Sequence, residues 1–318
     1  MKCNISMKNP EKPIWKPNKS TMKSLNISQF QDFLNKKQDL AIGNYTQLHQ
    51  FSVDETEKFW SSIVEFCDID FIQAEKQVMK YGKHKIDSDW FVGGKLNYAQ
   101  NILKHQSTRT AITFENEEGE KSTLSYQQMY AKVAKLQHYL QAQGIKKDDV
   151  VAGFLPNITE TIIAMLATTS LGAIWTSTSP DFGFEGVVDR FGQVQTKLMF
   201  TTDAYYYNGK THDCLEKARI IAKKIPSIEK VVVINFTNSD FELDGNFIHW
   251  HQAMANNNDK VHIEPMDFKQ PLYILYSSGT TGKPKCIVHG HGGILLQHKK
   301  ELVLHSNVNP EDTLFYFT

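Results

Sequence analysis

The stretch "DVVAGFLPNITETIIAMLATTSLGAIWTS", residues 149–177, decides the fold. Its first seven residues form a short apolar run that ends before a proline, which predicts a buried strand. A helix is expected from about residue 159 to residue 169, and residues 172–177 predict a second apolar strand. Strand, helix and strand in this order form the crossover unit of parallel sheets, so the stretch favours an α/β fold.

The alternation of helices and strands continues on both sides of this stretch. Strands are expected at residues 111–115, 197–202, 230–236 and 271–278, and helices at residues 123–144, 184–195 and 214–225. Ser125 is a candidate N-cap and Gly144 a candidate stop for the first of these helices, while Asp181 is a candidate cap for the helix that contains Val187. The pattern predicts a layered α/β domain with mostly parallel sheets.

The residues before this domain have a different character. Residues 1–40 are expected to be a partly disordered leader that ends in a short helix at about 28–40. Residues 41–100 predict a small helical region, with two or three amphipathic helices between 47 and 81 and a structured connector, "DWFVGGKLNYAQN", at 89–101. Residues 101–318 are expected to form the first part of the α/β domain.

The last residues predict one more strand, "TLFYF", at 313–317. A domain seldom stops inside an apolar strand, because the backbone groups of that strand would lack partners. We therefore expect the chain to be the truncated N-terminal portion of a longer protein.

The charge balance argues against several classes of partner. Lys and Arg together number 35, as do Asp and Glu, so the formal net charge is zero. A nucleic-acid or membrane-surface protein usually carries a basic excess, and we expect neither partner. The four cysteines form no CxxC pair, and the first 24 residues contain no apolar core of a secretion signal, which favours a cytoplasmic protein.

The stretch "YSSGTTGKPK", residues 276–285, carries the clearest chemical signal. Its glycines let backbone amides approach an anion, its hydroxyls donate hydrogen bonds and its lysines add positive charge. It does not match the Walker sequence GxxxxGK[ST], because Ser277 occupies the first glycine position and Pro284 the position of the metal-binding hydroxyl. The GxSxG elbow of hydrolases does not match either. A simple turn between two strands is the alternative to phosphate binding.

This stretch resembles the phosphate-binding loop of the acyl-adenylating enzymes, which include acyl-CoA synthetases, luciferases and the adenylation domains of peptide synthetases. "GKPKCIVHG" at 282–290, "WFVGGKLNYAQNIL" at 90–103 and residues 172–210 resemble the acetoacetyl-CoA synthetase branch. The resemblance covers roughly residues 45–318 and implies the layered α/β fold of the large N-terminal domain of that family. It also implies that the ATP phosphates are bound by Ser277, Ser278, Gly279, Thr280, Thr281, Gly282, Lys283 and Lys285.

The reaction implied by the resemblance is an AMP-forming ligation in two steps. A carboxylate attacks the α-phosphorus of ATP and releases pyrophosphate, and the thiol of coenzyme A then displaces AMP. The implied small-molecule partners are acetoacetate, ATP and coenzyme A, with Mg²⁺ as cofactor. The family's Mg²⁺ glutamate, ribose aspartate and catalytic lysine belong to later motifs that this sequence does not contain. We therefore expect no complete catalytic site, and no adenylation by residues 1–318 alone.

The remaining candidate residues carry less specific signals. Trp175 and His289 are candidates for a substrate pocket, and a position in the core is the alternative for Trp175. His289 and His291 stand on one short segment with no Asp or Glu nearby in the sequence, so no metal site is expected there. Two other functions stay open: a synthetase for acetate or another short-chain acid, and a non-catalytic nucleotide-binding module.

Overall fold

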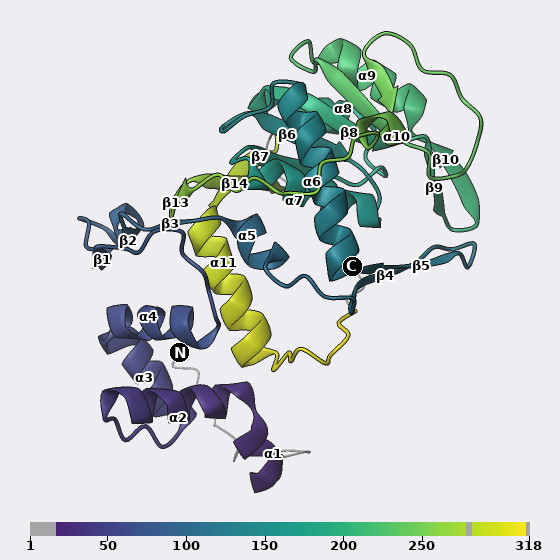
Figure 1. Ribbon diagram of the computed structural model, residues 1–318. Coiled ribbons are helices and arrows are strands. Elements are labelled where there is room, and N and C mark those ends of the chain that lie inside the picture. The colour runs from purple at the N-terminus through teal and green to yellow at the C-terminus, as the bar shows by residue number, and fades with distance from the viewer. Residues whose placement is uncertain (1–16, 278–281, 316–318) are drawn as a thin grey trace, which may run out of the picture. The chain divides into compact units, whose positions relative to one another are not determined.

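The computed structural model describes residues 17–277 and 282–315 (Figure 1). The chain divides into two compact units. The larger unit comprises Ile69–Leu295, and the smaller combines the described residues up to Asp68 with those from Leu296 onward. The larger unit contains the α/β layers that the sequence predicts.

A seven-stranded sheet forms the centre of the larger unit. Neighbouring strands run parallel throughout, except that the last strand is antiparallel to its neighbour. The predicted α/β class with a mostly parallel sheet is therefore confirmed. The strands lie in the order β12 (Phe247–His249), β11 (Lys230–Ile234), β8 (Thr196–Thr202), β6 (Val150–Phe154), β7 (Ile174–Thr178), β14 (Pro271–Ser277) and β15 (Lys285–Gly290).

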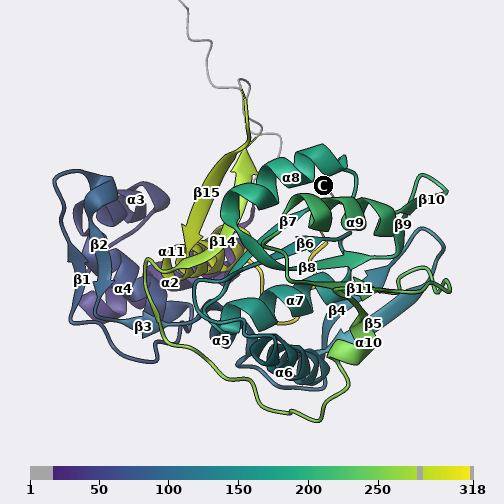
Figure 2. The same cartoon turned by 90° about the horizontal axis from the view of Figure 1, so that it is seen from above.

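Helices cover both faces of this sheet (Figure 2). The helices α6 (Tyr126–Ala142) and α7 (Thr159–Ser170) lie on one face, and α8 (Phe184–Phe191) and α9 (Leu215–Lys224) lie on the other. Alternate residues of a strand therefore enter different cores. Val232 packs in the core beneath α6 and α7, whereas Val231 and Val233 pack beneath α8 and α9. All three side chains are fully buried, and burying each one contributes about 1.5–3 kcal/mol of transfer free energy.

The start and end of α6 follow from local sequence chemistry. Ser125 Oγ accepts a hydrogen bond from the backbone N–H of Gln128 (3.1 Å), and the Gln128 side chain accepts one from the N–H of Ser125 (2.9 Å). This reciprocal pair is a capping box. Gly144, two residues beyond the helix, has a φ of +74°, which glycine adopts without strain. Both predicted boundary residues of this helix are confirmed.

The predicted cap of the next helix is wrong. The N-cap of α8 is Gly183, and no side chain bonds to the free amides there. The carboxylate of Asp181 instead accepts hydrogen bonds from the hydroxyls of Ser179 (2.6 Å) and Tyr205 (2.7 Å). Asp181 therefore stabilises the turn between β7 and α8 rather than the start of α8 itself.

The predictions for the two ends of the chain differ from the structure in part. Residues 313–315 form no strand, and Leu314 and Phe315 are 63% and 83% exposed, because no described strand lies beside them. Residues 316–317 of that predicted strand lie outside the described chain.

Between residues 47 and 81 two helices, α3 (Tyr45–Asp54) and α4 (Thr56–Phe66), are followed by strand β1 (Gln77–Lys80). This strand pairs with β2 (Asp89–Val92) rather than extending the helical pattern.

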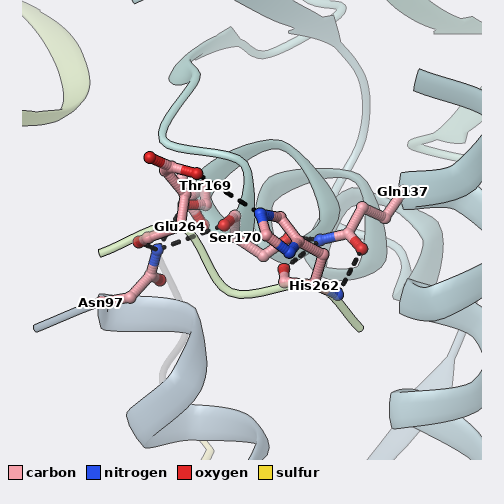
Figure 3. Close-up of polar contacts among 6 residues, drawn as sticks. All are labelled: Asn97, Gln137, Thr169, Ser170, His262 and Glu264. Atoms are coloured by element: carbon pink, nitrogen blue, oxygen red, sulfur yellow. Dashed lines mark hydrogen bonds and ion pairs between the residues drawn. The ribbon is translucent and has the colours of Figure 1, made fainter. Parts of the chain in front are cut away.

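A buried polar network ties the connector to the layers of the larger unit (Figure 3). The side-chain amide of Asn97 donates to the backbone carbonyls at the end of α7 and to that of Glu264 (2.9 Å). Gln137 of α6 donates to the carbonyl of His262 and accepts the N–H of the same residue (2.7 Å). Both amides are almost fully buried, so losing these partners would cost about 1–3 kcal/mol each. The network fixes the segment that leads into β14.

Short elements complete the larger unit, and two of them, β9 and β10, form a hairpin that was not expected from the sequence. These elements are β3 (Lys95–Leu96), α5 (Tyr98–Leu103), β4 (Thr110–Glu115), β5 (Lys121–Ser125), β9 (Ala204–Tyr207), β10 (Lys210–Asp213), α10 (Trp250–Ala253), β13 (Met266–Asp267) and the first part of α11 (His291–Lys299).

The smaller unit is helical. It contains α1 (Lys19–Ser24), α2 (Asn26–Gln38), α3, α4, the end of α11 and a π-helical segment, Lys300–His305. Its fully buried side chains include Phe30 and Ile63, and Asn26 bonds through its backbone N–H to Asn307 Oδ1 (2.7 Å). A cavity of about 220 Å³ lies against Phe30 and Trp60. In the described part of the chain, no helix is both long and apolar enough to cross a membrane.

Candidate phosphate-binding site

The described residues of the stretch 276–285 lie at the carboxyl edge of the parallel strands. β14 ends at Ser277 and β15 begins at Lys285, and these two residues stand opposite each other in the antiparallel pair. Ligands of open α/β sheets bind at this edge, because loops from several strands meet there. The predicted site residues Ser278, Gly279, Thr280 and Thr281 lie outside the described residues. Gly282 has a φ of +140°, a conformation that other residues rarely adopt.

The two lysines of the stretch are available to an anion. Both Lys283 and Lys285 are exposed, and neither forms an ion pair within the ranges that the structure describes. Lys285 begins β15, so its backbone is fixed by the strand pairing with Ser277. An ammonium group on a fixed backbone can neutralise phosphate charge without first breaking another ion pair.

Tyr276 anchors the strand that enters the loop. Thr176 Oγ1 of β7 lies within hydrogen-bonding distance of the Tyr276 hydroxyl (3.0 Å) and of the Ile274 carbonyl oxygen (2.9 Å). Burial raises the pKa of Tyr276 to about 12, so its hydroxyl remains protonated at neutral pH and acts as a hydrogen-bonding group. The residue before the loop is therefore held by the neighbouring strand.

Two residues that the sequence did not predict also contact this hairpin. Arg190, at the end of α8, lies near the Tyr276 ring, and the side chain of Gln193 donates to the carbonyl of Pro284. Neither residue belongs to the quoted stretch, and only their helical spacing of three, which places both on one side of a helical turn, was visible in the sequence.

Two carboxylates lie in the other loops at this edge. The hydrogen bonds from Ser179 and then Tyr205 hold the pKa of Asp181 below its usual range, so Asp181 is ionised at neutral pH. Asp203, just after β8, is 4% exposed and accepts the backbone N–H of Phe236 (2.6 Å) and hydrogen bonds from Thr237. Both carboxylates are used to hold loops in place.

The two candidates for a substrate pocket lie away from the loop. Trp175 is 5% exposed in the core beneath α6 and α7, and a Cβ on Gly153 would come within 2.7 Å of its ring. Its strand neighbour Tyr273 stands opposite His289, and the rings of that pair are 5.2 Å apart. A row across three strands therefore contains Trp175, Tyr273 and His289. Its member in β14, Tyr273, lies four residues before the last residue of that strand, Ser277. The structure places Trp175 in the core, the alternative that its sequence left open.

The described residues contain no cluster of metal-binding side chains. No group of three or more His, Cys, Asp or Glu side chains in residues 17–277 and 282–315 could hold a metal ion. His291 is fully buried and its Nδ1 accepts a hydrogen bond from the backbone N–H of Tyr98 (3.2 Å). Burial lowers the pKa of His291 to about 3, and its environment is that of a core residue.

Known proteins resemble this chain in sequence and in fold. The family model described as AMP-binding enzyme matches residues 99–318, and that of the acetyl-coenzyme A synthetase N-terminus matches residues 45–102. An acetoacetyl-CoA synthetase of Danio rerio is 38% identical over 319 residues, which cover 96% of this chain and 47% of that protein. A malonamoyl-CoA synthetase of Penicillium aethiopicum is 35% identical over 333 residues, covering 98% of this chain and 46% of its own length.

The solved structure of the acetoacetyl-CoA synthetase from Streptomyces lividans superimposes with a TM-score of 0.92 at 35% identity. The match covers 96% of this chain and 48% of that one, so the chain spans about half the length of the relatives that it matches. The predicted resemblance to acetoacetyl-CoA synthetases and the predicted fold are thereby confirmed. With the paired strands β14 and β15 in the expected place and a family model that covers most of its length, the chain belongs to the AMP-binding enzyme family.

Proposed function

We propose that this chain supplies the phosphate-binding part of an enzyme that ligates acetoacetate to coenzyme A through an acyl-adenylate, with release of AMP and pyrophosphate. The observation that carries the proposal is the position of Ser277 and Lys285, paired at the carboxyl edge of the sheet. The similarity to acetoacetyl-CoA synthetases supports the choice of acid. The partners proposed are acetoacetate, ATP and coenzyme A, in the cytoplasm.

In this proposal the residues of the stretch act on the leaving group. The hydroxyl of Ser277, those of the three residues Ser278, Thr280 and Thr281, and the amides of Gly279 and Gly282 orient the β- and γ-phosphates. Lys283 and Lys285 neutralise the charge that grows on pyrophosphate as the carboxylate attacks the α-phosphorus. Such chemistry needs positioned charge rather than a protein nucleophile. Mg²⁺, the expected cofactor, would neutralise part of the phosphate charge when bound.

We also propose a division of the chain into a leader at 1–40, a helical region at 41–100 and the first part of the adenylating domain at 101–318. The matches of the two family models at 45–102 and 99–318 support the second boundary. The compact units group the final residues with the early helices, so a boundary in sequence is not a boundary between compact units here.

The test is exchange of labelled pyrophosphate into ATP by the full-length protein that the gene of this chain encodes, rather than by residues 1–318 alone. Acetoacetate should support the fastest exchange in a panel with acetate and malonamate, an acid suggested by one relative. Fastest exchange with acetate would assign the alternative acid. An absence of exchange with every acid, in a protein that still binds ATP, would favour the non-catalytic nucleotide-binding module.

A further inference from the structure

One helix end contacts the hairpin on both sides of the loop. The Arg190 guanidinium carbon lies 5.8 Å from the centre of the Tyr276 ring, and Gln193 Nε2 donates to the Pro284 carbonyl (3.1 Å). Tyr276 precedes the loop and Pro284 follows it, so both strand ends are reached from the end of α8 and the 3₁₀ turn, Gly192–Val194, that follows it. Figure 2 shows α8 beside the β14–β15 hairpin.

Arg190 is itself held in a fixed orientation. Its Nη1 donates to the Gly186 carbonyl (2.7 Å), and its guanidinium carbon lies 4.4 Å from the centre of the Phe182 ring. Phe182 is in the turn after β7 and is 40% exposed. A guanidinium contacts an aromatic ring through its plane as well as its charge, which an ammonium group cannot do. Arg190 therefore links the turn after β7 to the strand that enters the loop.

The positive charge of Arg190 is not neutralised locally. No carboxylate in the described ranges forms an ion pair with it, whereas Arg219 of α9 pairs with Asp244. The charge thus adds to that of Lys283 and Lys285 near the two strand ends, where a polyphosphate would be attracted.

We propose that Phe182, Arg190 and Gln193 form a positioning clamp, the α8 clamp, which sets the spacing of the two strand ends that carry the phosphate loop. The proposal rests on the proposed function, because ATP is taken to be the ligand of that loop. The clamp acts through its contacts with Tyr276 and Pro284. Losing it should loosen the hairpin and weaken ATP binding while the rest of the fold persists.

The test combines hydrogen–deuterium exchange with ATP titration on the 318-residue chain. Arg190→Met keeps the length of the side chain but removes its charge and plane. We expect roughly fivefold faster exchange of the Lys285–Gly290 amides and a roughly fivefold higher Kd for ATP. Arg190→Lys, which restores charge without the plane, should recover only part of each effect. Gln193→Ala, which removes the side-chain bonds to Pro284 and to the Asp189 carbonyl but keeps Arg190, is a second variant in case Arg190→Met does not fold.

The matched control is Arg219→Met. Its guanidinium carbon also lies over a ring, 5.2 Å from the centre of Phe247, but it does not contact the hairpin, and wild-type values are expected. Unchanged exchange in both Arg190→Met and Gln193→Ala would overturn the clamp. Faster exchange with unchanged ATP affinity would overturn its positioning role. Faster exchange in a chain whose wild type binds no ATP would support the clamp and overturn the proposed function, so the two failures are distinguishable.

Discussion

His291 shows at the scale of one residue how burial determines protonation. Its side chain is fully buried and its Nδ1 accepts the Tyr98 N–H, so the proton of the neutral ring is on Nε2. Within the described residues that Nε2 has no hydrogen-bond partner. Burial lowers the pKa from 6.5 to about 3, because the charged imidazolium would lose its water without gaining a partner.

This pKa predicts an acid-sensitive stability. Above pH 6.5 the ring is neutral in both states and contributes no pH dependence. Below pH 6.5 the histidine takes up a proton in the unfolded chain but stays neutral in the native chain. The free energy of unfolding therefore falls as the pH drops toward 3. At pH 5 the difference in pKa lowers the free energy of unfolding by about 2 kcal/mol relative to its value at neutral pH.

Urea unfolding at pH 7.5 and pH 5.0 measures this effect. His291→Gln, which keeps an acceptor for Tyr98, should lose about 2 kcal/mol less stability between the two values than the wild type. His105→Gln, at an exposed histidine, should keep the wild-type difference. An identical difference in all three proteins would show that His291 is protonated without cost.

At the scale of the element, adjacent glycines in α11 have opposite requirements. A Cβ on Gly292 would overlap the Phe268 ring, whereas nothing lies within 4 Å of a Cβ on Gly293. Phe268 cannot move freely, because its ring stacks on Phe91 at 5.0 Å. The helix therefore packs this closely against the segment before β14 only because residue 292 lacks a side chain.

Alanine substitutions at the two glycines should shift stability in opposite directions. Gly292→Ala should cost about 1–3 kcal/mol by overpacking. Gly293→Ala should gain about 0.5–1 kcal/mol, because alanine favours the helix more than glycine. The midpoints of urea unfolding at pH 7.5 measure both changes. Equal shifts would mean that the contact with Phe268 does not limit the packing of α11.

Some elements were predictable from the sequence because their determinants are local. The run at 150–154 is apolar and buried throughout, and the Ser125 capping box lies within four residues. The strand predicted at 313–317 failed over residues 313–315 because a strand needs a neighbour, which composition does not show. The hairpin β9–β10 was missed, although "YNGK" at 207–210 contains the Asn-Gly pair typical of tight hairpin turns.

The candidate site was predictable in one part only. Glycines, hydroxyls and lysines within ten residues of sequence predict a loop suited to phosphate, and that role stays a prediction. The contacts of Arg190 and Gln193 with the hairpin join residues as far as 91 positions apart, so no local pattern indicates them. Asp203 was missed for the same reason, because its partners follow a different strand.

At the scale of the whole molecule, the sheet places the described residues of the candidate phosphate-binding site at one edge. The parallel strands direct their carboxyl ends, and the hairpin that carries Ser277 and Lys285, to the same side of the larger unit. The chain spans about half the length of its relatives, so binding of ATP, rather than turnover, is the property to test in these 318 residues.

The most direct measurement is calorimetric titration of the 318-residue chain with ATP. The wild type should bind ATP, and Lys285→Ala should raise the Kd roughly tenfold, because a charge-assisted contact with phosphate is lost. Lys147→Ala, at an exposed lysine just before β6 and so at the amino edge of the sheet, should bind as the wild type does. Unchanged affinity in Lys285→Ala, or no binding by the wild type, would contradict a phosphate-binding role for this loop.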